Sequence, residues 1–308
     1  MRLKISVLIF FITFVSCQKE TPNKKKASTI NYLIEVEELL KIAEEPNIKI
    51  LDFRKAEFYK NEHIEGALNI WRTDIEDASY PYIGMMASKS QIEKLFSNLG
   101  IENGDTIVIY DDNGLCDSAR LWWILQNYDY TKVKLLHGGI KVWKNKNGKV
   151  TKDTTLIKKS SFKLPNNPSL RYHLSKEEML TSVNNKSIII DTRTIDEYSG
   201  KRRKKGAFKG GRIPKSSFID WANAIDYHGN KKIKPLQELE PIYKKFIPSK
   251  NDTVMIYCHS GVRSAHTTFV LTQLLNYKNV KNYDGSWTEW SYFNDLPFEK
   301  DSITTITK

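Results

Sequence analysis

The sequence of 308 residues repeats itself, and this repetition limits the possible folds more than any other feature. Each half has an apolar run that ends in Asp-x-Arg or just before it, a second apolar run that ends in Tyr, and a glycine-containing turn followed by Trp. The corresponding segments are 49–54 and 189–193, 104–110 and 251–257, and 136–143 and 283–290. One duplicated unit per half predicts two domains of the same fold, each large enough to bury its own core.

The spacing of the repeats places an insertion in the second half. Asp52 and Asp191 are 139 positions apart, whereas Tyr110 and Tyr257 are 147 positions apart. The second half therefore carries eight additional residues between these landmarks. Segment 200–211, which contains the run Lys201-Arg202-Arg203-Lys204-Lys205, is where we place the insertion. We interpret this run as a solvated loop.

The local patterns predict the α/β class. Apolar runs at 187–191 and 253–257 have the length of buried strands, and 34–43 and 264–275 have helical spacing. Ser175-x-x-Glu178 is a capping box that predicts a helix through Val183. This alternation favours a parallel sheet with helices on both faces in each half. A segment rich in Lys, Asn and Pro at 148–168 is expected to link the halves.

The N-terminus has the pattern of an export signal. Two basic residues precede an apolar run at 5–14, which is too short to span a bilayer. Segment 14–17 ends in Cys17 and resembles the lipobox of bacterial lipoproteins. The resemblance implies a signal peptide at 1–16, lipidation of Cys17, a tether at 17–29 and a lipid-anchored protein of the bacterial cell envelope, either periplasmic or on the outer surface. The alternative is an ordinary or uncleaved signal in which Cys17 has no role.

Composition excludes several classes. A content of 40% hydrophobic and 27% charged residues is typical of a globular chain, which excludes disorder, collagen and coiled coil for the whole sequence. The net charge of +12 favours anionic partners. Export argues against nucleic acid among these partners, so we expect small anions and a membrane reached through the lipid. Three cysteines are too few for a disulfide framework.

The strongest chemical signal follows the apolar run 253–257. Cys258 comes directly after this strand, and the sequence continues through Gly261 and Arg263 into a helical pattern. A loop between a strand and a helix directs backbone N–H groups and the positive end of the helix dipole at its interior. A cysteine there should have a lowered pKa, and Arg263 adds a fixed positive charge. We therefore predict a loop that holds an anion at the sulfur; the alternative is a buried structural cysteine.

These motifs together resemble the two-domain sulfurtransferases of the rhodanese type. Cys258-x-x-Gly261-x-Arg263-Ser264 looks like the active-site loop of that family. Segment 283–290 resembles its C-terminal signature, and Asp52-x-Arg54 with 63–67 resembles its N-terminal signature. The resemblance spans about 30–298. It implies two tandem rhodanese-like domains, at 30–147 and at 169–305.

The same resemblance implies that the first domain is inactive. Asp111 occupies the position that corresponds to Cys258, and a carboxylate does not carry a transferable sulfur. Cys116 corresponds to Arg263, and we interpret it as a small loop or core residue. The inactive domain is then expected to wall off one side of the catalytic cleft.

The resemblance implies a ping-pong sulfur transfer without a metal or organic cofactor. Cys258 is the expected nucleophile. The substrate-binding residues that the resemblance and the loop imply are Arg263, Arg193, His259, Ser260, Gly261, Val262 and Ser264. For some of these residues a purely structural role is the alternative to substrate binding. Arg263 and Arg193 are also candidates for salt bridges, and Ser260 and His259 for turn or solvent-facing positions.

The partners follow from that chemistry. We expect a small anionic sulfur donor, with thiosulfate favoured over 3-mercaptopyruvate, and a nucleophilic acceptor such as cyanide or a thiol, acting on a monomer. In this interpretation the basic run 201–205 is also a candidate rim that concentrates the donor. A phosphatase with a Cys-x5-Arg loop is a rival, but only four residues separate Cys258 from Arg263. A sulfur carrier or redox sensor without turnover is the non-enzymatic alternative.

Overall fold

The computed structural model describes residues 31–185 and 187–301. The expected signal peptide, the lipidated Cys17 and the tether lie outside these residues, so their assignment stays a prediction. Within the described residues, no helix has both the length and the apolar character that crossing a membrane requires.

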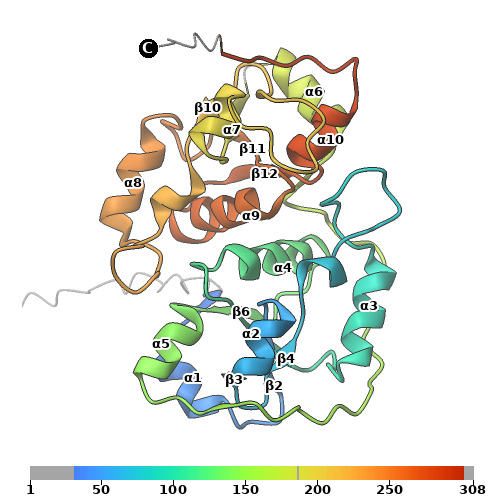
Figure 1. Ribbon diagram of the computed structural model, residues 1–308, viewed down its shortest axis with the longest axis vertical. Helices are drawn as coiled ribbons and strands as arrows, with labels where there is room; N and C mark the ends of the chain where they lie inside the picture. The colour runs from blue at the N-terminus through green and yellow to red at the C-terminus, as the bar shows by residue number, and fades with distance from the viewer. Residues whose placement is uncertain (1–30, 186, 302–308) are drawn as a thin grey trace, which may run out of the picture. The chain divides into compact units, whose positions relative to one another are not determined.

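The first half is built on a five-stranded parallel sheet with the strand order β1-β6-β5-β2-β4. Strands β2, β4 and β6 of this sheet are labelled in Figure 1. A short antiparallel pair, β3 with β7, lies beside it. The elements are β1 (Leu33–Ile34), α1 (Val36–Ile42), β2 (Ile48–Asp52), α2 (Ala56–Asn61), β3 (His63–Ile64), β4 (Leu68–Asn69), the 3-10 helix η1 (Arg72–Asp74), α3 (Lys89–Asn98), β5 (Thr106–Tyr110), α4 (Cys116–Asn127), β6 (Val133–Leu136), α5 (Gly139–Asn145) and β7 (Val150–Thr151).

The second half repeats this plan with the parallel order β10-β9-β11-β12-β8. The elements are β8 (His173–Leu174), α6 (Lys176–Asn184), β9 (Ile188–Asp191), α7 (Ile195–Ser199), β10 (Ser217–Phe218), the 3-10 helix η2 (Trp221–Ala224), α8 (Leu236–Lys244), β11 (Thr253–Tyr257), α9 (Val262–Phe269), the π-helical turn η3 (Val270–Leu274), β12 (Asn279–Tyr283) and α10 (Ser286–Tyr292). The predicted α/β class and the tandem repeat are confirmed.

Helices cover both faces of each sheet because the strand side chains alternate. On β5, Ile107 and Ile109 pack with α3 and α4, whereas Val108 and Tyr110 pack in a second cluster with α1 and α5. Successive residues of a strand point to opposite faces, so a strand that is apolar throughout must be covered twice. The predicted two-sided covering of the parallel sheet is therefore present.

Helices α4 and α9 join the two halves. All residues of α4 are buried, since one side packs on its own sheet and the other on α9. Trp122 of α4 meets Phe269 of α9 edge-to-face with ring centroids 4.9 Å apart, and one apolar cluster continues from the first sheet into the second. The amino end of α9 carries the cysteine loop, so this packing brings the first half next to that loop.

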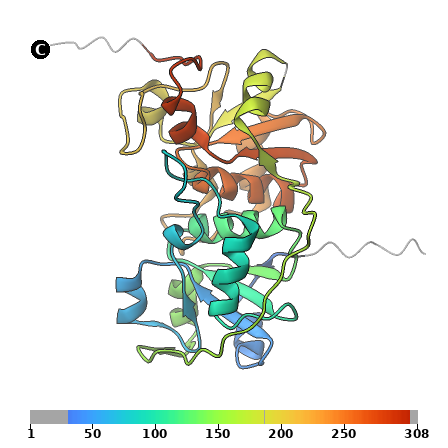
Figure 2. The same cartoon turned by 90° about the vertical axis from the view of Figure 1, so that its right-hand side faces the viewer.

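Local details differ from the sequence-based expectations at element ends. Ile34 belongs to β1, and α1 begins only at Val36. The helix expected at 264–275 begins at Val262 and ends in a π-helical turn. The Ser175 capping box opens α6 as predicted. Segment 148–168 links the halves but runs along the first one (Figure 2), where Phe162 of this segment is fully buried.

Candidate active site

The cysteine loop lies between β11 and α9 and opens onto a small cavity. Cys258 is the first residue after β11, and its side chain is only 1% exposed. The cavity has a volume of about 180 Å³ and takes its walls from both halves. It is lined by Arg72, Asn113, Cys116, Lys204, Trp221, Cys258, His259, Ser260, Val262 and Arg263.

Hydrogen bonds from the segment around α10 turn the carbonyl groups of the loop outward. In a trans peptide the N–H of the next residue points the opposite way, so outward carbonyls direct amides at the loop interior. The bonds are Trp287 N to Cys258 O at 3.1 Å, Thr288 N to His259 O at 2.9 Å and Asn282 Nδ2 to Gly261 O at 3.1 Å. Hydrogen bonds from Trp287, Thr288 and Asn282 of the second half thus hold the predicted cradle of amides in place.

Ser286 takes up two of the loop amides. Its hydroxyl oxygen accepts hydrogen bonds from Cys258 N at 3.2 Å and Gly261 N at 3.0 Å, and the hydroxyl donates to Tyr283 O at 2.8 Å. These two amides are therefore committed to Ser286. The Ser260 amide and the amide and hydroxyl of Ser264 are among the groups that remain to stabilise the sulfur.

The surroundings of Cys258 favour its thiolate. Burial opposes ionisation, but the Arg263 guanidinium, the hydroxyl and amide of Ser264 and the Ser260 amide together hold the pKa of the Cys258 thiol below its ordinary value. The Ser264 hydroxyl is fully buried and forms no hydrogen bond among the described residues, so it is available to donate to a thiolate at Cys258. A thiolate is the nucleophilic form of cysteine.

Arg263 faces a carboxylate of the protein. Its Nη1 and Nη2 donate to the two carboxylate oxygens of Glu197 at 2.8 and 2.9 Å. Glu197 is buried, but the Arg263 guanidinium lowers the pKa of its carboxyl to about 2. The salt bridge that the sequence left open as an alternative is therefore formed. Arg263 still lines the cavity, and its charge acts on the thiol.

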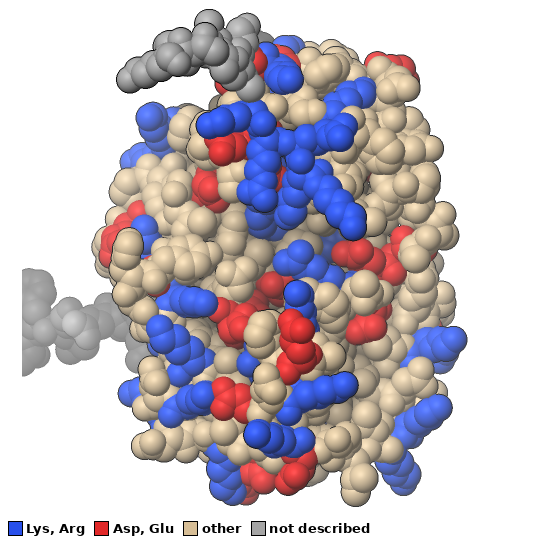
Figure 3. Space-filling view, viewed as in Figure 1, with Lys and Arg blue, Asp and Glu red and all other residues tan. Residues whose placement is uncertain are grey.

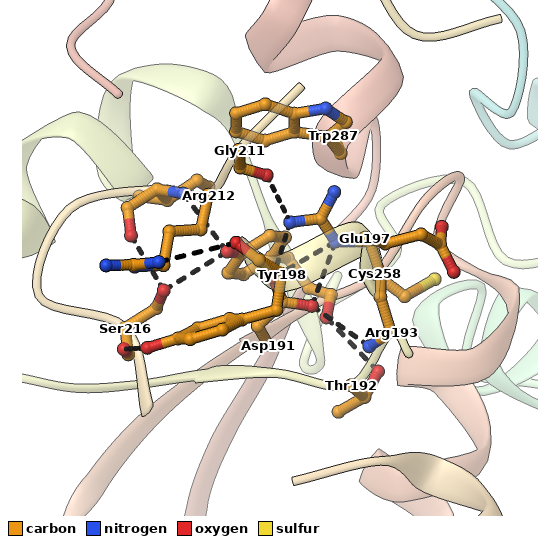
Figure 4. A network of polar contacts seen from close by, with 12 residues as sticks. Asp191, Thr192, Arg193, Glu197, Tyr198, Gly211, Arg212, Ser216, Cys258 and Trp287 are labelled. Atoms are coloured by element: carbon orange, nitrogen blue, oxygen red, sulfur yellow. Dashed lines mark hydrogen bonds and ion pairs between the residues drawn. The ribbon is translucent and has the colours of Figure 1, made fainter. Parts of the chain in front are cut away.

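Arg193 lies in a buried network of polar contacts (Figure 4). Its Nε donates to Asp191 Oδ1 at 3.0 Å, its Nη2 donates to Asp191 Oδ2 and Gly211 O at 2.6 Å each, and its guanidinium lies 4.7 Å from the ring centroid of Trp287. Its Nε and Nη2 donate only to groups of the protein, and Arg193 is absent from the cavity lining. The geometry favours the bracing role over donor binding.

The remaining loop residues surround the thiol closely. His259 Nε2 donates to Lys205 O at 3.0 Å, and burial together with Lys204 lowers the pKa of His259 to about 4, so the ring is neutral at pH 7. Gly261 has a φ of +75°, and a Cβ there would lie 2.6 Å from Arg120 Nη1, which explains the glycine. Ser260 and Val262 line the cavity.

Asp111 occupies the position in the first half that corresponds to Cys258 in the second. It follows β5 as Cys258 follows β11, and its carboxylate accepts four backbone hydrogen bonds. The donors are Asn113 N at 3.0 Å, Leu115 N at 2.9 Å, Asp117 N at 3.1 Å and Ser118 N at 3.0 Å. The anion cradle is thus kept in the first half, with a carboxylate of the chain in place of sulfur.

Several site residues were not predicted from the sequence. Arg72, Asn113 and Cys116 of the first half reach the cavity, and Arg72 Nε pairs with Asp117 Oδ1 at 2.5 Å. Cys116 is buried as expected, and burial and Asp117 raise the pKa of its thiol. For Asn113 and Cys116 the signal was their place in the repeat, at the loop that corresponds to the cysteine loop; Arg72 lies outside that loop, in η1, and no signal in the sequence pointed to it.

Arg120 of α4 reaches across from the first half to the cysteine loop. Its Nη2 donates to Asp284 Oδ1 at 2.6 Å and to Gly84 O at 2.7 Å, and its Nη1 lies 3.4 Å from Gly261 O. The Arg120 and Asp284 side chains are each 2% exposed. Arg120 therefore adds a donor from the first half to the Gly261 carbonyl, which Asn282 also holds.

Comparison with known proteins identifies the family. The family model described as "Rhodanese-like domain" matches residues 35–146 and 175–292. "Putative thiosulfate sulfurtransferase 1" of Mycobacterium bovis is 34% identical over 248 residues, covering 78% of this chain and 87% of the relative. "Sulfur carrier protein TtuD" of Thermus thermophilus is 30% identical over 268 residues, covering 83% and 92%.

A solved structure shows the same fold. SseA from Escherichia coli, described as a 3-mercaptopyruvate sulfotransferase, superposes with a TM-score of 0.73 at 23% identity, over 83% of this chain and 99% of that one. Two matched domains, the relatives' sequences and the cysteine loop agree: the chain belongs to the rhodanese family of sulfurtransferases and consists of two rhodanese-like domains.

Proposed function

We propose that the protein transfers the outer sulfur of thiosulfate to a nucleophilic acceptor through a persulfide on Cys258. The observation that carries this proposal is the Cys258 thiol in its cradle, with a pKa held below the ordinary value, at the wall of a cavity of about 180 Å³. The names of relatives such as the one from Mycobacterium bovis support it.

The reaction balances in two steps. The Cys258 thiolate attacks the outer sulfur of thiosulfate, the S–S bond of the donor breaks, and sulfite leaves with the electron pair. An acceptor such as cyanide then attacks the terminal sulfur of the persulfide, and the electron pair of the broken S–S bond returns to Cys258. The amides and the Ser264 hydroxyl stabilise negative charge on sulfur as an oxyanion hole does on oxygen.

The charged side chains around the thiol favour thiosulfate as the donor. Arg263 and Arg72 each face a carboxylate of the protein. Lys204, which also lines the cavity, forms no salt bridge with any described residue. A compact ammonium suits the sulfonate end of thiosulfate, whereas the planar carboxylate of 3-mercaptopyruvate is best bound by a free guanidinium fork.

The central experiment measures thiocyanate formed from thiosulfate and cyanide, together with the mass of the protein after treatment with donor alone. Wild type and Cys116→Ser should turn over and gain one sulfur atom in mass, whereas Cys258→Ser should do neither. A sulfur adduct on Cys258 without repeated turnover would favour a sulfur carrier, the activity in the name of the Thermus thermophilus relative. No adduct on Cys258 would refute the proposal.

The donor is tested by comparing kcat/KM for thiosulfate and 3-mercaptopyruvate. Thiosulfate should be preferred by at least about tenfold, which corresponds to roughly 1.4 kcal/mol of transition-state stabilisation. Lys204→Met should raise KM for thiosulfate, and Lys201→Met, an exposed neighbour outside the cavity, serves as the matched control. A preference for 3-mercaptopyruvate would overturn the donor assignment, and a phosphate ester should not react.

We also propose that Cys17 carries lipid and anchors the protein in the bacterial cell envelope. The support is the sequence pattern of segment 1–17 alone. Growth of an expressing bacterium with labelled palmitate should label the wild-type chain but not Cys17→Ser. Equal labelling of both would contradict the proposal.

A further inference from the structure

The mouth of the cavity carries a surface that a small donor does not need. Lys204 of the basic run 201–205 lines the cavity, but the neighbouring Arg202 and Arg203 do not. All five residues of the run are exposed, and within the described part of the chain their only salt bridge is the loose one between Lys201 and Asp196, at 3.9 Å. Figure 3 shows Lys and Arg side chains gathered on this part of the second half.

An exposed apolar patch adjoins the basic run. Its members are Tyr80, Ile83, Phe208 and Tyr292, whose exposed fractions range from 37% to 53%. Tyr292 and Phe208 are in ring contact at 5.0 Å between centroids, and Tyr292 is linked to Tyr80 through the ring of Tyr82. Contiguous exposed apolar surface, with aromatic residues and arginine, is typical of protein–protein contact sites.

The run and the patch meet at the catalytic loop. A Cβ at Gly206, the residue after the run, would lie 3.0 Å from Ile83 Cδ1 and 3.6 Å from His259 Nε2. Lys205 O accepts a hydrogen bond from that His259 nitrogen, and Thr288 Oγ1 donates to Ile83 O at 2.7 Å. The surface is therefore built from both halves, and it borders the cavity that holds the thiol.

We propose that this surface docks the sulfur acceptor, and that the acceptor is a protein or peptide thiol set among acidic residues. The inference rests on the proposed function and specifies its second substrate. Uncompensated cations select an acidic partner by charge complementarity, and the apolar patch supplies the area that a macromolecule buries. In the transfer, the acceptor thiolate attacks the terminal sulfur of the Cys258 persulfide and becomes a persulfide, and the electron pair of the broken bond returns to Cys258.

The test isolates the second half-reaction. The full chain is loaded with thiosulfate, freed of excess donor and mixed with synthetic peptides of equal length that carry one cysteine among acidic, neutral or basic residues. The gain of one sulfur by the peptide is followed by mass spectrometry, with dithiothreitol as an uncharged small acceptor. The acidic peptide should react about tenfold faster than the basic one at low salt, and the difference should shrink in about 0.5 M salt.

Variants assign the effect to the surface. Arg202→Glu with Arg203→Glu should slow the acidic peptide by about tenfold and leave dithiothreitol within about twofold. Phe208→Ser should slow all three peptides but not dithiothreitol. Charge reversal at Lys244 and Lys245, exposed residues at the end of α8, is the matched control and should change nothing.

Three results would overturn the inference. They are equal rates for acidic and basic peptides in wild type, a charge-reversal variant that is equally slow with dithiothreitol, and a basic run that binds phosphatidylglycerol vesicles without affecting any peptide rate. Thiocyanate formation from thiosulfate and cyanide is measured in parallel. If it persists in these cases, the docking inference fails and the proposed function stands; if it is absent in wild type, the proposed function itself fails.

Discussion

Removal of one hydroxyl from the cradle tests how the thiol is activated. Ser264 is fully buried, and its hydroxyl forms no hydrogen bond among the described residues, yet it acts to lower the pKa of Cys258. Ser264→Ala therefore removes a donor that is available to the thiolate and leaves no other polar group unpaired. We expect the pKa of Cys258 to rise and the stability of the fold to change little.

The size of the effect follows from the hydrogen bond. A bond to a charged group contributes about 1.5–3 kcal/mol, and one pKa unit corresponds to about 1.4 kcal/mol, so the pKa of Cys258 should rise by roughly 1–2 units. Below both pKa values the thiolate fraction then falls about 10- to 100-fold. A more basic thiolate is a better nucleophile, with a Brønsted slope of about 0.4–0.5, so the alkylation rate should fall only about 3- to 10-fold.

The assay is the pH dependence of Cys258 alkylation by iodoacetamide, measured in a Cys116→Ser background. Ser182→Ala is the matched control, because Ser182 is a buried helical serine whose hydroxyl donates to Glu178 O, far along the chain from the loop. It should leave the alkylation profile unchanged. A Ser264→Ala profile that coincides with that of the parent would refute the argument that the hydroxyl stabilises the thiolate.

Three further predictions concern ionisable groups around the loop. Glu197 has a folded pKa of about 2 and an ordinary value of 4.5, so its stabilisation is present above about pH 4.5 and is lost as the pH falls toward 2. The free energy of unfolding should drop by on the order of 3 kcal/mol across this range. Urea titrations at several pH values would measure it, and a drop of equal size in Glu197→Gln would contradict the assignment. Because His259 is neutral at pH 7, the pH profile of kcat/KM for thiosulfate should lack an inflection near 6.5; an inflection that disappears in His259→Gln would show the opposite. Arg120→Met and Asp284→Asn should each cost about 3–5 kcal/mol, and the double variant should lose at least about 1 kcal/mol less than the sum, as a coupled buried pair requires; strictly additive losses in urea unfolding would mean that the pair is not coupled.

The sequence by itself determined the features that depend on neighbours along the chain. The position of Cys258 after a strand, the glycine at Gly261 and the helix that begins there are encoded within one short segment, and the duplicated pattern identifies Asp111 as its counterpart. Strand and helix periodicity reflect which faces are buried, so the α/β class and the parallel sheets could be predicted as well. Element ends such as Ile34 were placed less well, because pairing with β6, and not local preference, makes that residue a strand.

Only the tertiary structure decided which groups meet at the sulfur. Arg193 and Arg263 look alike in the sequence as cationic candidates, but the fold buries Arg193 against Asp191 and Gly211 and leaves Arg263 beside the thiol. The cavity wall formed by Arg72 exists only because α4 packs on α9 and brings the two halves together. The contacts that form the cavity between the two halves join residues more than a hundred positions apart, and their geometry depends on the packing of whole elements, which no local pattern records.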